Sequence, residues 1–93
     1  MTSKERAKLR GLANRVPSLY QVGKDGISEN MIKQIDDALN ARELIKGNVL
    51  ENSMLSAREA AEELAAKTAS QVVQVIGNKI ILYRKGDKNL CEM

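Results

Sequence analysis

Helix-start signals alternate with short β-prone runs along this chain, and the alternation restricts the possible fold more than any other feature. Thr2 and Glu5 have the spacing of a capping box. Ser56 and Glu59 repeat that spacing, and Ser28 can cap a third helix. Apolar residues at helical spacing follow each signal. Because strands that are separated by helices favour parallel crossovers, the pattern predicts an α/β fold.

The β-prone runs lie between and after these helices. They span residues 19–22, 44–50, 72–76 and 80–83. The last two flank Gly77-Asn78, a turn signal for an antiparallel hairpin. We therefore predict the order αβαβαββ, with a four-stranded mixed sheet packed with three helices in an α+β two-layer arrangement. We expect Gly47 to weaken the second β-prone run, at residues 44–50, because its missing side chain costs packing or marks a bulge.

The chain has 93 residues, which supply material for a single core. We expect one domain at residues 1–85 and a polar, mobile tail at 86–93. The aromatic residues, Tyr20 and Tyr83, are expected in the core or at a sheet edge. Cys91 lies in the tail without a disulfide partner, so we expect an exposed thiol and a cytoplasmic protein. The apolar runs fall short of the ~20 residues of a membrane span, so no membrane partner is expected.

The net charge of +3 is distributed unevenly along the chain. Residues 1–24 carry six basic side chains and one acidic one, whereas acidic residues outnumber basic ones in 25–70. On the first helix, Lys4, Lys8 and Arg15 fall on one stripe. A solvated helix face is the ordinary alternative, but acidic partners for pairing are almost absent. We interpret the stripe as a binding surface.

The turn Gly23-Lys24-Asp25-Gly26 joins the first β-prone run to the second helix. Two glycines let the backbone turn sharply and let another chain approach closely. The helix start that follows offers backbone N–H groups, and Lys24 adds a mobile positive charge, so the turn suits a phosphodiester backbone. A plain strand-to-helix connection is the alternative, and the preceding basic helix favours binding. We predict a composite site with the turn at its centre.

Groups for catalysis are scarce in this chain. Histidine is missing from the sequence and the one cysteine is in the tail, which removes the usual general base, thiol nucleophile and soft metal sites. Asp36 and Asp37 are adjacent on a helix, so their side chains diverge by about 100°. Neither a P-loop nor a nucleotide fingerprint occurs. We expect no enzymatic activity, no metal site, no cofactor and no small-molecule substrate.

A family resemblance lies in residues 2–13, TSKERAKLRGLA, and residues 21–30, QVGKDGISEN. Together with residues 41–46 and 73–77, these segments resemble the YhbY-like group of the CRM family, named for chloroplast RNA splicing and ribosome maturation. The resemblance implies a stand-alone bacterial CRM domain that associates with precursors of the large ribosomal subunit. It also implies a fold similar to the C-terminal domain of translation initiation factor three, and a loop similar to the Gly-x-x-Gly loop of KH domains.

The family's RNA surface combines that loop with nearby basic residues. Carried over to this sequence, it comprises Gly23, Lys24, Gly26, Lys4, Lys8 and Arg15, with Arg42, Lys46 and Arg84 as weaker candidates. The sequence departs from the family pattern at Asp25, where Gly or Asn is frequent, and at Gly47, where a branched apolar residue is usual. Asp25 lies inside the loop, where its carboxylate would repel a phosphate about 4 Å away by roughly 1 kcal/mol.

We therefore predict an assembly factor that binds structured ribosomal RNA, or a particle precursor of the large subunit, through backbone contacts. Structured RNA is favoured because the chain offers few rings for stacking on unpaired bases. The alternative is a protein-interaction module that docks its basic helix on an acidic partner, such as a ribosomal protein or a GTPase. Sequence-specific DNA binding is least favoured, because a recognition helix is not recognisable.

Overall fold

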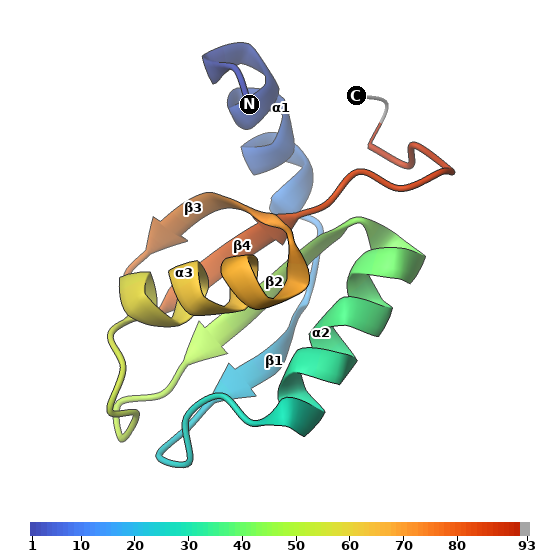
Figure 1. The fold of residues 1–93 in the computed structure, drawn as a ribbon. Coiled ribbons are helices and arrows are strands. Elements are labelled where there is room, and N and C mark those ends of the chain that lie inside the picture. The colour runs from blue at the N-terminus through green and yellow to red at the C-terminus, as the bar shows by residue number, and fades with distance from the viewer. Residues whose placement is uncertain (92–93) are drawn as a thin grey trace.

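The structure, a computed structural model, describes residues 1–91. Its elements follow the predicted order αβαβαββ (Figure 1). They are α1 (Ser3–Ala13), β1 (Ser18–Val22), α2 (Glu29–Arg42), β2 (Leu44–Val49), α3 (Ala57–Thr68), β3 (Gln71–Ile76) and β4 (Lys79–Tyr83). The predicted fold class is confirmed.

The four strands form one mixed sheet in the order β1-β2-β4-β3. β1 and β2 pair in parallel, and α2 is the crossover between them. β4 pairs antiparallel with both β2 and β3. The β3–β4 hairpin turns at Gly77, whose positive φ of 55° suits glycine. The last strand of the chain therefore occupies a central position in the sheet.

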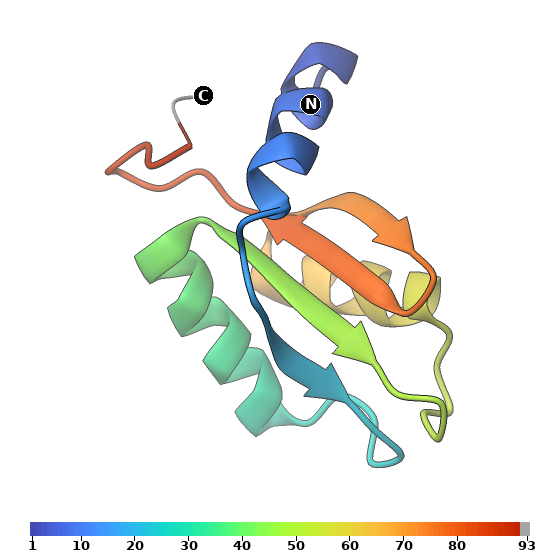
Figure 2. The same cartoon turned by 180° about the vertical axis from the view of Figure 1, so that it is seen from behind.

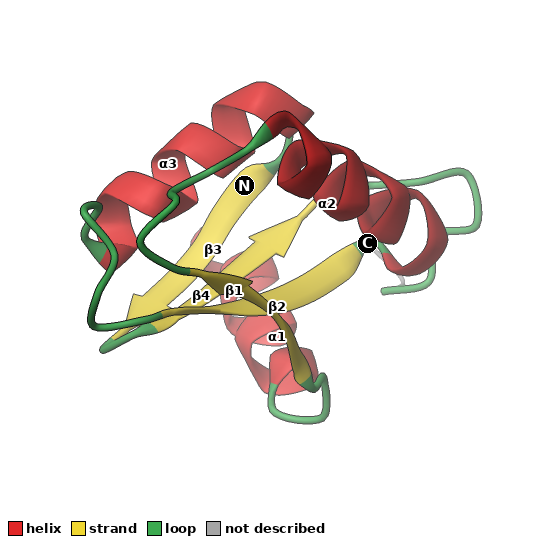
Figure 3. Ribbon diagram, turned by 90° about the horizontal axis from the view of Figure 1, so that it is seen from below, coloured by secondary structure: helices red, strands yellow, loops and turns green. Residues whose placement is uncertain are grey.

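The helices lie on both faces of the sheet (Figure 3). α2 and α3 cover one face, where Ile35, Leu39 and Leu64 belong to the larger core cluster. The buried alanines Ala60 and Ala61 of α3 allow a close approach to the strands. α1 lies on the opposite face, near one end of the sheet (Figure 2), and adds a partial third layer to the expected two.

Beneath α1 is a second, smaller core cluster. It consists of Leu9, Ala13, Leu44, Val73, Ile81, Tyr83 and Cys91. Residues of β2 therefore alternate between the two clusters, with Leu44 facing α1 and Ile45 facing α2 and α3. The same alternation separates Ile80 from Ile81 on β4. This assignment of faces determines where the polar strand residues point.

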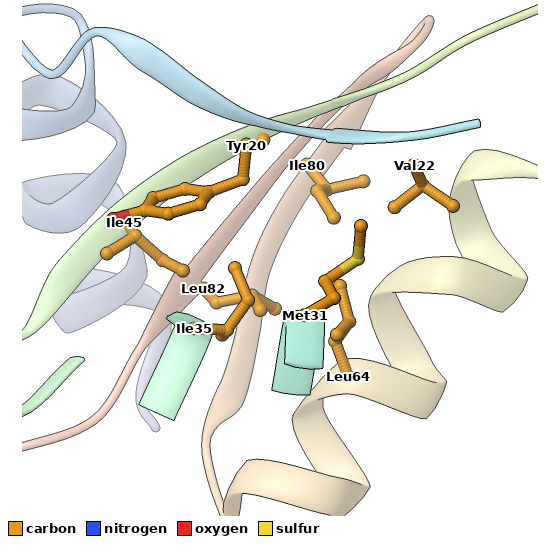
Figure 4. Close-up of a pocket in the computed structure, with 9 residues that line it drawn as sticks. Tyr20, Val22, Met31, Ile35, Ile45, Leu64, Ile80 and Leu82 are labelled. Carbon is orange, nitrogen blue, oxygen red and sulfur yellow. The ribbon is translucent and has the colours of Figure 1, made fainter. Parts of the chain in front are cut away.

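The larger core contains a cavity of about 10 Å³ next to Gly47 (Figure 4). Its lining is apolar and comes from β1, β2, β4, α2 and α3. Tyr20 and Met31 border the cavity, with their side chains directed into the region between the sheet and the helices. Gly47 lines the cavity, but a Cβ at this position would already lie close to Ile80 and to the Tyr20 backbone, so the predicted weakening of the strand by Gly47, through lost packing or a bulge, stays a prediction.

The two predicted capping boxes are present. Thr2 Oγ1 accepts from the Glu5 backbone N–H at 3.1 Å, and Glu5 Oε1 accepts from the Thr2 N–H at 2.8 Å. Ser56 and Glu59 form the same reciprocal pair at the start of α3. Hydrogen bonds from the Thr2 backbone and side chain lower the pKa of Glu5, because they favour the charged carboxylate. Local sequence signals therefore define these two helix starts.

The segment after β4 returns to the body of the domain. Leu90 N–H donates to Oε1 of the buried Glu43 at 2.8 Å. Cys91 is 7% exposed and joins the cluster beneath α1, so the expectation of an exposed thiol is wrong. Residues 86–91 thus contact the domain, whereas residues 92–93 of the predicted tail lie outside the described residues. The domain boundary at residue 85 stays a prediction.

Candidate nucleic-acid interface

The turn at residues 23–26 is closed by a hydrogen bond from the Gly26 N–H to the Gly23 carbonyl oxygen at 3.0 Å. Gly26 has a φ of 70°, a left-handed conformation that disfavours residues with a Cβ. A Cβ there would meet open space, so the backbone conformation is what requires glycine. Lys24 and Asp25 are both exposed. The turn therefore presents one positive and one negative side chain to solvent.

The helix start behind the turn is less open to anions than the sequence suggested. α2 begins at Glu29, and the Ser28 hydroxyl already accepts from the Met31 N–H at 3.1 Å. Glu29 places a carboxylate in the first turn. Because a carboxylate at this position competes with an incoming phosphate for the helix dipole, the contribution of α2 to anion binding is reduced.

The loop between β2 and α3 lies beside the turn, which the sequence did not predict. The Leu50 N–H donates to the Val22 carbonyl oxygen at 2.8 Å. A Cβ at Gly23 would lie 3.6 Å from Leu50 Cδ1 and 3.9 Å from Asn52 Oδ1. Met54, in the same connection between β2 and α3, is 87% exposed. A long-range parallel pairing creates this neighbourhood, so no local sequence signal could have indicated it.

The basic residues of α1 lie far from the turn. Lys4 and Lys8 of α1 are exposed, as expected, and the helix buries Leu9 and Ala13 against the sheet. Arg15 was predicted to lie on the same helix, but α1 ends at Ala13, so this exposed residue lies in the turn that follows α1. Figures 1 and 2 show α1 at one end of the sheet and the connection between β1 and α2 at the other. β1 runs between them, along a molecule whose longest axis is 35 Å. The turn and the basic residues of α1 therefore lie toward opposite ends of the sheet, so the turn is not at the centre of a patch formed with them.

The described residues 1–91 show neither a metal site nor a membrane-spanning helix. Among residues 1–91, no group of three His, Cys, Asp or Glu side chains could hold a metal ion. None of the helices described has the length and apolar character needed to cross a membrane.

Asp36 contacts Arg84, while Asp37 lies 3.9 Å from Lys33, so these carboxylates diverge as predicted.

Comparison with known proteins identifies the family. The family model of the CRS1 / YhbY (CRM) domain matches residues 1–84 of this chain. The chain belongs to the CRS1/YhbY (CRM) domain family. The resemblance found in the sequence is thereby confirmed, and the match extends through α1, the turn and all four strands.

Similar proteins support the assignment to CRM domains. A Bacillus subtilis relative, named Probable RNA-binding protein YqeI, is 46% identical over 89 residues, which cover 96% of this chain and 93% of the relative. The Arabidopsis thaliana CRM-domain containing factor CFM2, chloroplastic, is 29% identical over 80 residues, 86% of this chain and 8% of that protein. A CRM domain thus occurs both as nearly a whole protein and as a small part of a long one.

A solved structure has the same fold. The solution structure of the Staphylococcus aureus hypothetical protein SAV1595, described with a suggested RNA-binding role, superposes with a TM-score of 0.80. The two chains are 49% identical, and the alignment covers 96% of this chain and 93% of SAV1595. The CRM fold described above is therefore shared with a close structural relative.

The weaker site candidates occupy different surroundings in this CRM domain. Arg42 is exposed in the last turn of α2, at the end of the sheet where α1 packs (Figure 1). Lys46 is half-buried on β2 and is the cross-strand partner of Ile81, so it points to the α1 side. Arg84 binds four acceptors on α2 and α3, which leaves its guanidinium occupied within the domain. Arg84 is accordingly not part of the surface proposed below.

Proposed function

We propose that this CRM domain binds structured RNA through contacts to the phosphate backbone and performs no chemistry on it. The observation that carries the proposal is the family match over residues 1–84, together with relatives that are named RNA-binding proteins. The exposed basic side chains of α1 and the exposed Lys24 of the turn provide charges that attract phosphates. Ribosomal RNA of a large-subunit precursor is the target that the family resemblance implies.

The distance between α1 and the turn at residues 23–26 sets the minimum length of an RNA that contacts both. The longest axis of the domain is 35 Å, and α1 and the turn lie toward opposite ends of the sheet. An RNA that contacts both α1 and the turn must therefore extend along most of this axis. A short hairpin with a stem of this length is the simplest substrate for binding measurements.

The salt dependence of binding tests this proposal. Affinity for an RNA hairpin should fall steeply with salt, because each neutralised phosphate adds roughly 0.7 to 0.9 to the log–log slope. The combined variant Lys4→Ala, Lys8→Ala and Arg15→Ala should lower that slope by about 2 to 3. The control is Arg58→Ala with Lys67→Ala, which removes two exposed positive charges from α3. An unchanged slope in the α1 variant would exclude these residues from the interface.

The cellular target needs a separate experiment. Crosslinking of the protein to RNA in cells, followed by mapping of the crosslinked nucleotides, should identify sites in precursors of large-subunit ribosomal RNA. Crosslinks confined to other RNAs would contradict the assembly role while leaving RNA binding intact. Association with ribosomal proteins that survives nuclease treatment would instead support a docking role for the basic helix.

A further inference from the structure

The sheet face on the α1 side is covered over one half of its length. α1 packs on Leu44, Ile81 and Tyr83, at the end of the sheet farther from the turn. Within the part of the chain that the structure describes, no element covers the other half (Figure 2). Two large apolar side chains there, Leu19 and Ile76, are 52% and 56% exposed. We call this uncovered region the open face.

Strand register places polar residues in a row across the open face. Gln21 of β1 is the partner of Asn48 on β2, and Asn48 is the partner of Lys79 on β4. Neighbouring strands lie about 4.8 Å apart, so these three side chains are adjacent. Lys46 precedes Asn48 by two residues and lies on the same face. Two amides and two ammonium groups therefore form one continuous polar surface.

The charge of the open face matches a polyanion. Lys46 and Lys79 are the charged residues of the four strands, which contain no Asp or Glu. Within residues 1–91, no hydrogen bond or ion pair engages the side chains of Gln21, Asn48, Lys46 or Lys79. Gln21 and Lys79 are exposed, and the other two are half-buried. These groups are available to an incoming ligand.

The aromatic residues indicate which form of nucleic acid fits. Tyr20 points to the opposite side of the sheet, and Tyr83 is 6% exposed beneath α1. The open face therefore has no ring on which an unpaired base could stack. The minor groove of an A-form RNA helix is wide and shallow and displays 2′-hydroxyl groups. A 2′-hydroxyl both donates and accepts hydrogen bonds, as do the side-chain amides of Gln and Asn.

We propose that the open face binds the minor groove of an RNA helix, with Gln21 and Asn48 contacting 2′-hydroxyls and Lys46 and Lys79 contacting the flanking phosphates. This inference rests on the proposed function and adds a contact that distinguishes RNA from DNA, which phosphate contacts alone do not supply. The open face lies between α1 and the turn, so one RNA helix along it reaches both α1 and the turn.

The test compares an RNA hairpin with a DNA hairpin of the same sequence at fixed salt. The wild type is expected to prefer RNA, and Gln21→Ala with Asn48→Ala should reduce RNA affinity roughly tenfold while leaving DNA affinity unchanged. Gln34→Ala, which removes an exposed amide from α2, is the control and should keep the wild-type preference. A loss that is equal for RNA and DNA would overturn the inference, because it would indicate a general or structural effect.

The lysines are tested by salt titration. Lys46→Ala with Lys79→Ala should lower the log–log slope by about 1.5 for both hairpins, whereas Lys67→Ala on α3 should leave it unchanged. If the wild type binds RNA but the amide variant keeps its RNA preference, the inference is overturned and the proposed function stands. If the wild type binds no RNA hairpin, both fail. Equal affinity for an unpaired RNA of the same length would also overturn the duplex assignment.

Discussion

Arg84 and Asp36 are joined by two hydrogen bonds, although 48 positions separate them in the sequence. Arg84 Nη1 donates to Asp36 Oδ1 at 2.6 Å, and Nη2 donates to the Asp36 carbonyl oxygen at 2.9 Å. The same guanidinium donates to the Thr68 carbonyl oxygen and to Asn40 Oδ1. One side chain after β4 therefore connects α2 to the end of α3.

We predict that Arg84→Ala destabilises the domain by about 2 kcal/mol, because several charge-assisted hydrogen bonds are lost from a partly exposed position. Arg84→Lys should recover little of this, since an ammonium cannot reproduce the planar fork. Urea unfolding measures the change, and Lys85→Ala, at an exposed neighbour, is the control. If Arg84→Ala leaves the stability unaltered but weakens RNA binding, Arg84 belongs to the RNA surface, as the sequence suggested.

The thiol of Cys91 should react slowly with an alkylating reagent in the folded protein. Burial raises the pKa of this thiol, with a further contribution from Glu43, so the thiolate is scarce at neutral pH. Because the folded-state pKa is raised, the protonated thiol contributes stability at neutral pH that is lost as the pH rises through that value. Glu43→Ala should release residues 86–91 and accelerate alkylation.

Asp87→Ala, an exposed change in the same segment, is the matched control for Glu43→Ala and should leave the alkylation rate unchanged. A wild-type rate equal to that of the urea-unfolded protein would show that the segment moves freely, as the sequence analysis expected of the tail.

Gly47→Ala is expected to stabilise the domain by about 0.5 to 1 kcal/mol, because glycine in a strand interior loses more backbone entropy than alanine. A Cβ at this position would lie 3.3 Å from Ile80 Cγ1 and 3.4 Å from the Tyr20 carbonyl oxygen. Ile80 borders the cavity and has room to shift. The urea midpoint measures the effect. A lower midpoint would mean that the Tyr20 backbone cannot yield, and Gly47→Val should then be worse.

Asp25→Asn should tighten binding to an RNA hairpin by roughly fivefold at low salt, because a repulsion of about 1 kcal/mol is removed. Asp25→Gly should act in the same direction. The asparagine variant separates the charge from any change in backbone freedom. Glu63→Gln, an exposed charge change on α3, is the control. Equal or weaker affinity in fixed-salt titrations would place Asp25 outside the interface.

Local features were predictable from the sequence, because their determinants lie within a few residues of one another. The capping boxes at Thr2 and Ser56 gave the starts of α1 and α3, and Gly77-Asn78 gave the hairpin. Gly26 was recognised as a turn residue, and its positive φ agrees with that role.

Features that depend on long-range packing were not predictable in this way. Adjacency in the sequence suggested that α1 and the turn form one patch, whereas β1 holds them at opposite ends of the sheet. Arg84 and Lys85 are neighbouring cations that the sequence pattern does not distinguish. In the structure, Arg84 is held by hydrogen bonds to α2 and α3, whereas Lys85 is exposed. The open face was missed because it exists only once four strands are in register.

The central position of β4 has a consequence for how the domain is made. β1 and β2 emerge early in synthesis, but β2 and β3 are held together through the last strand of the chain. A nascent chain that stops before Lys79 therefore lacks the strand that joins its two halves, and its apolar strand surfaces remain exposed. The four-stranded sheet therefore cannot be completed before residues up to Tyr83 have been synthesised.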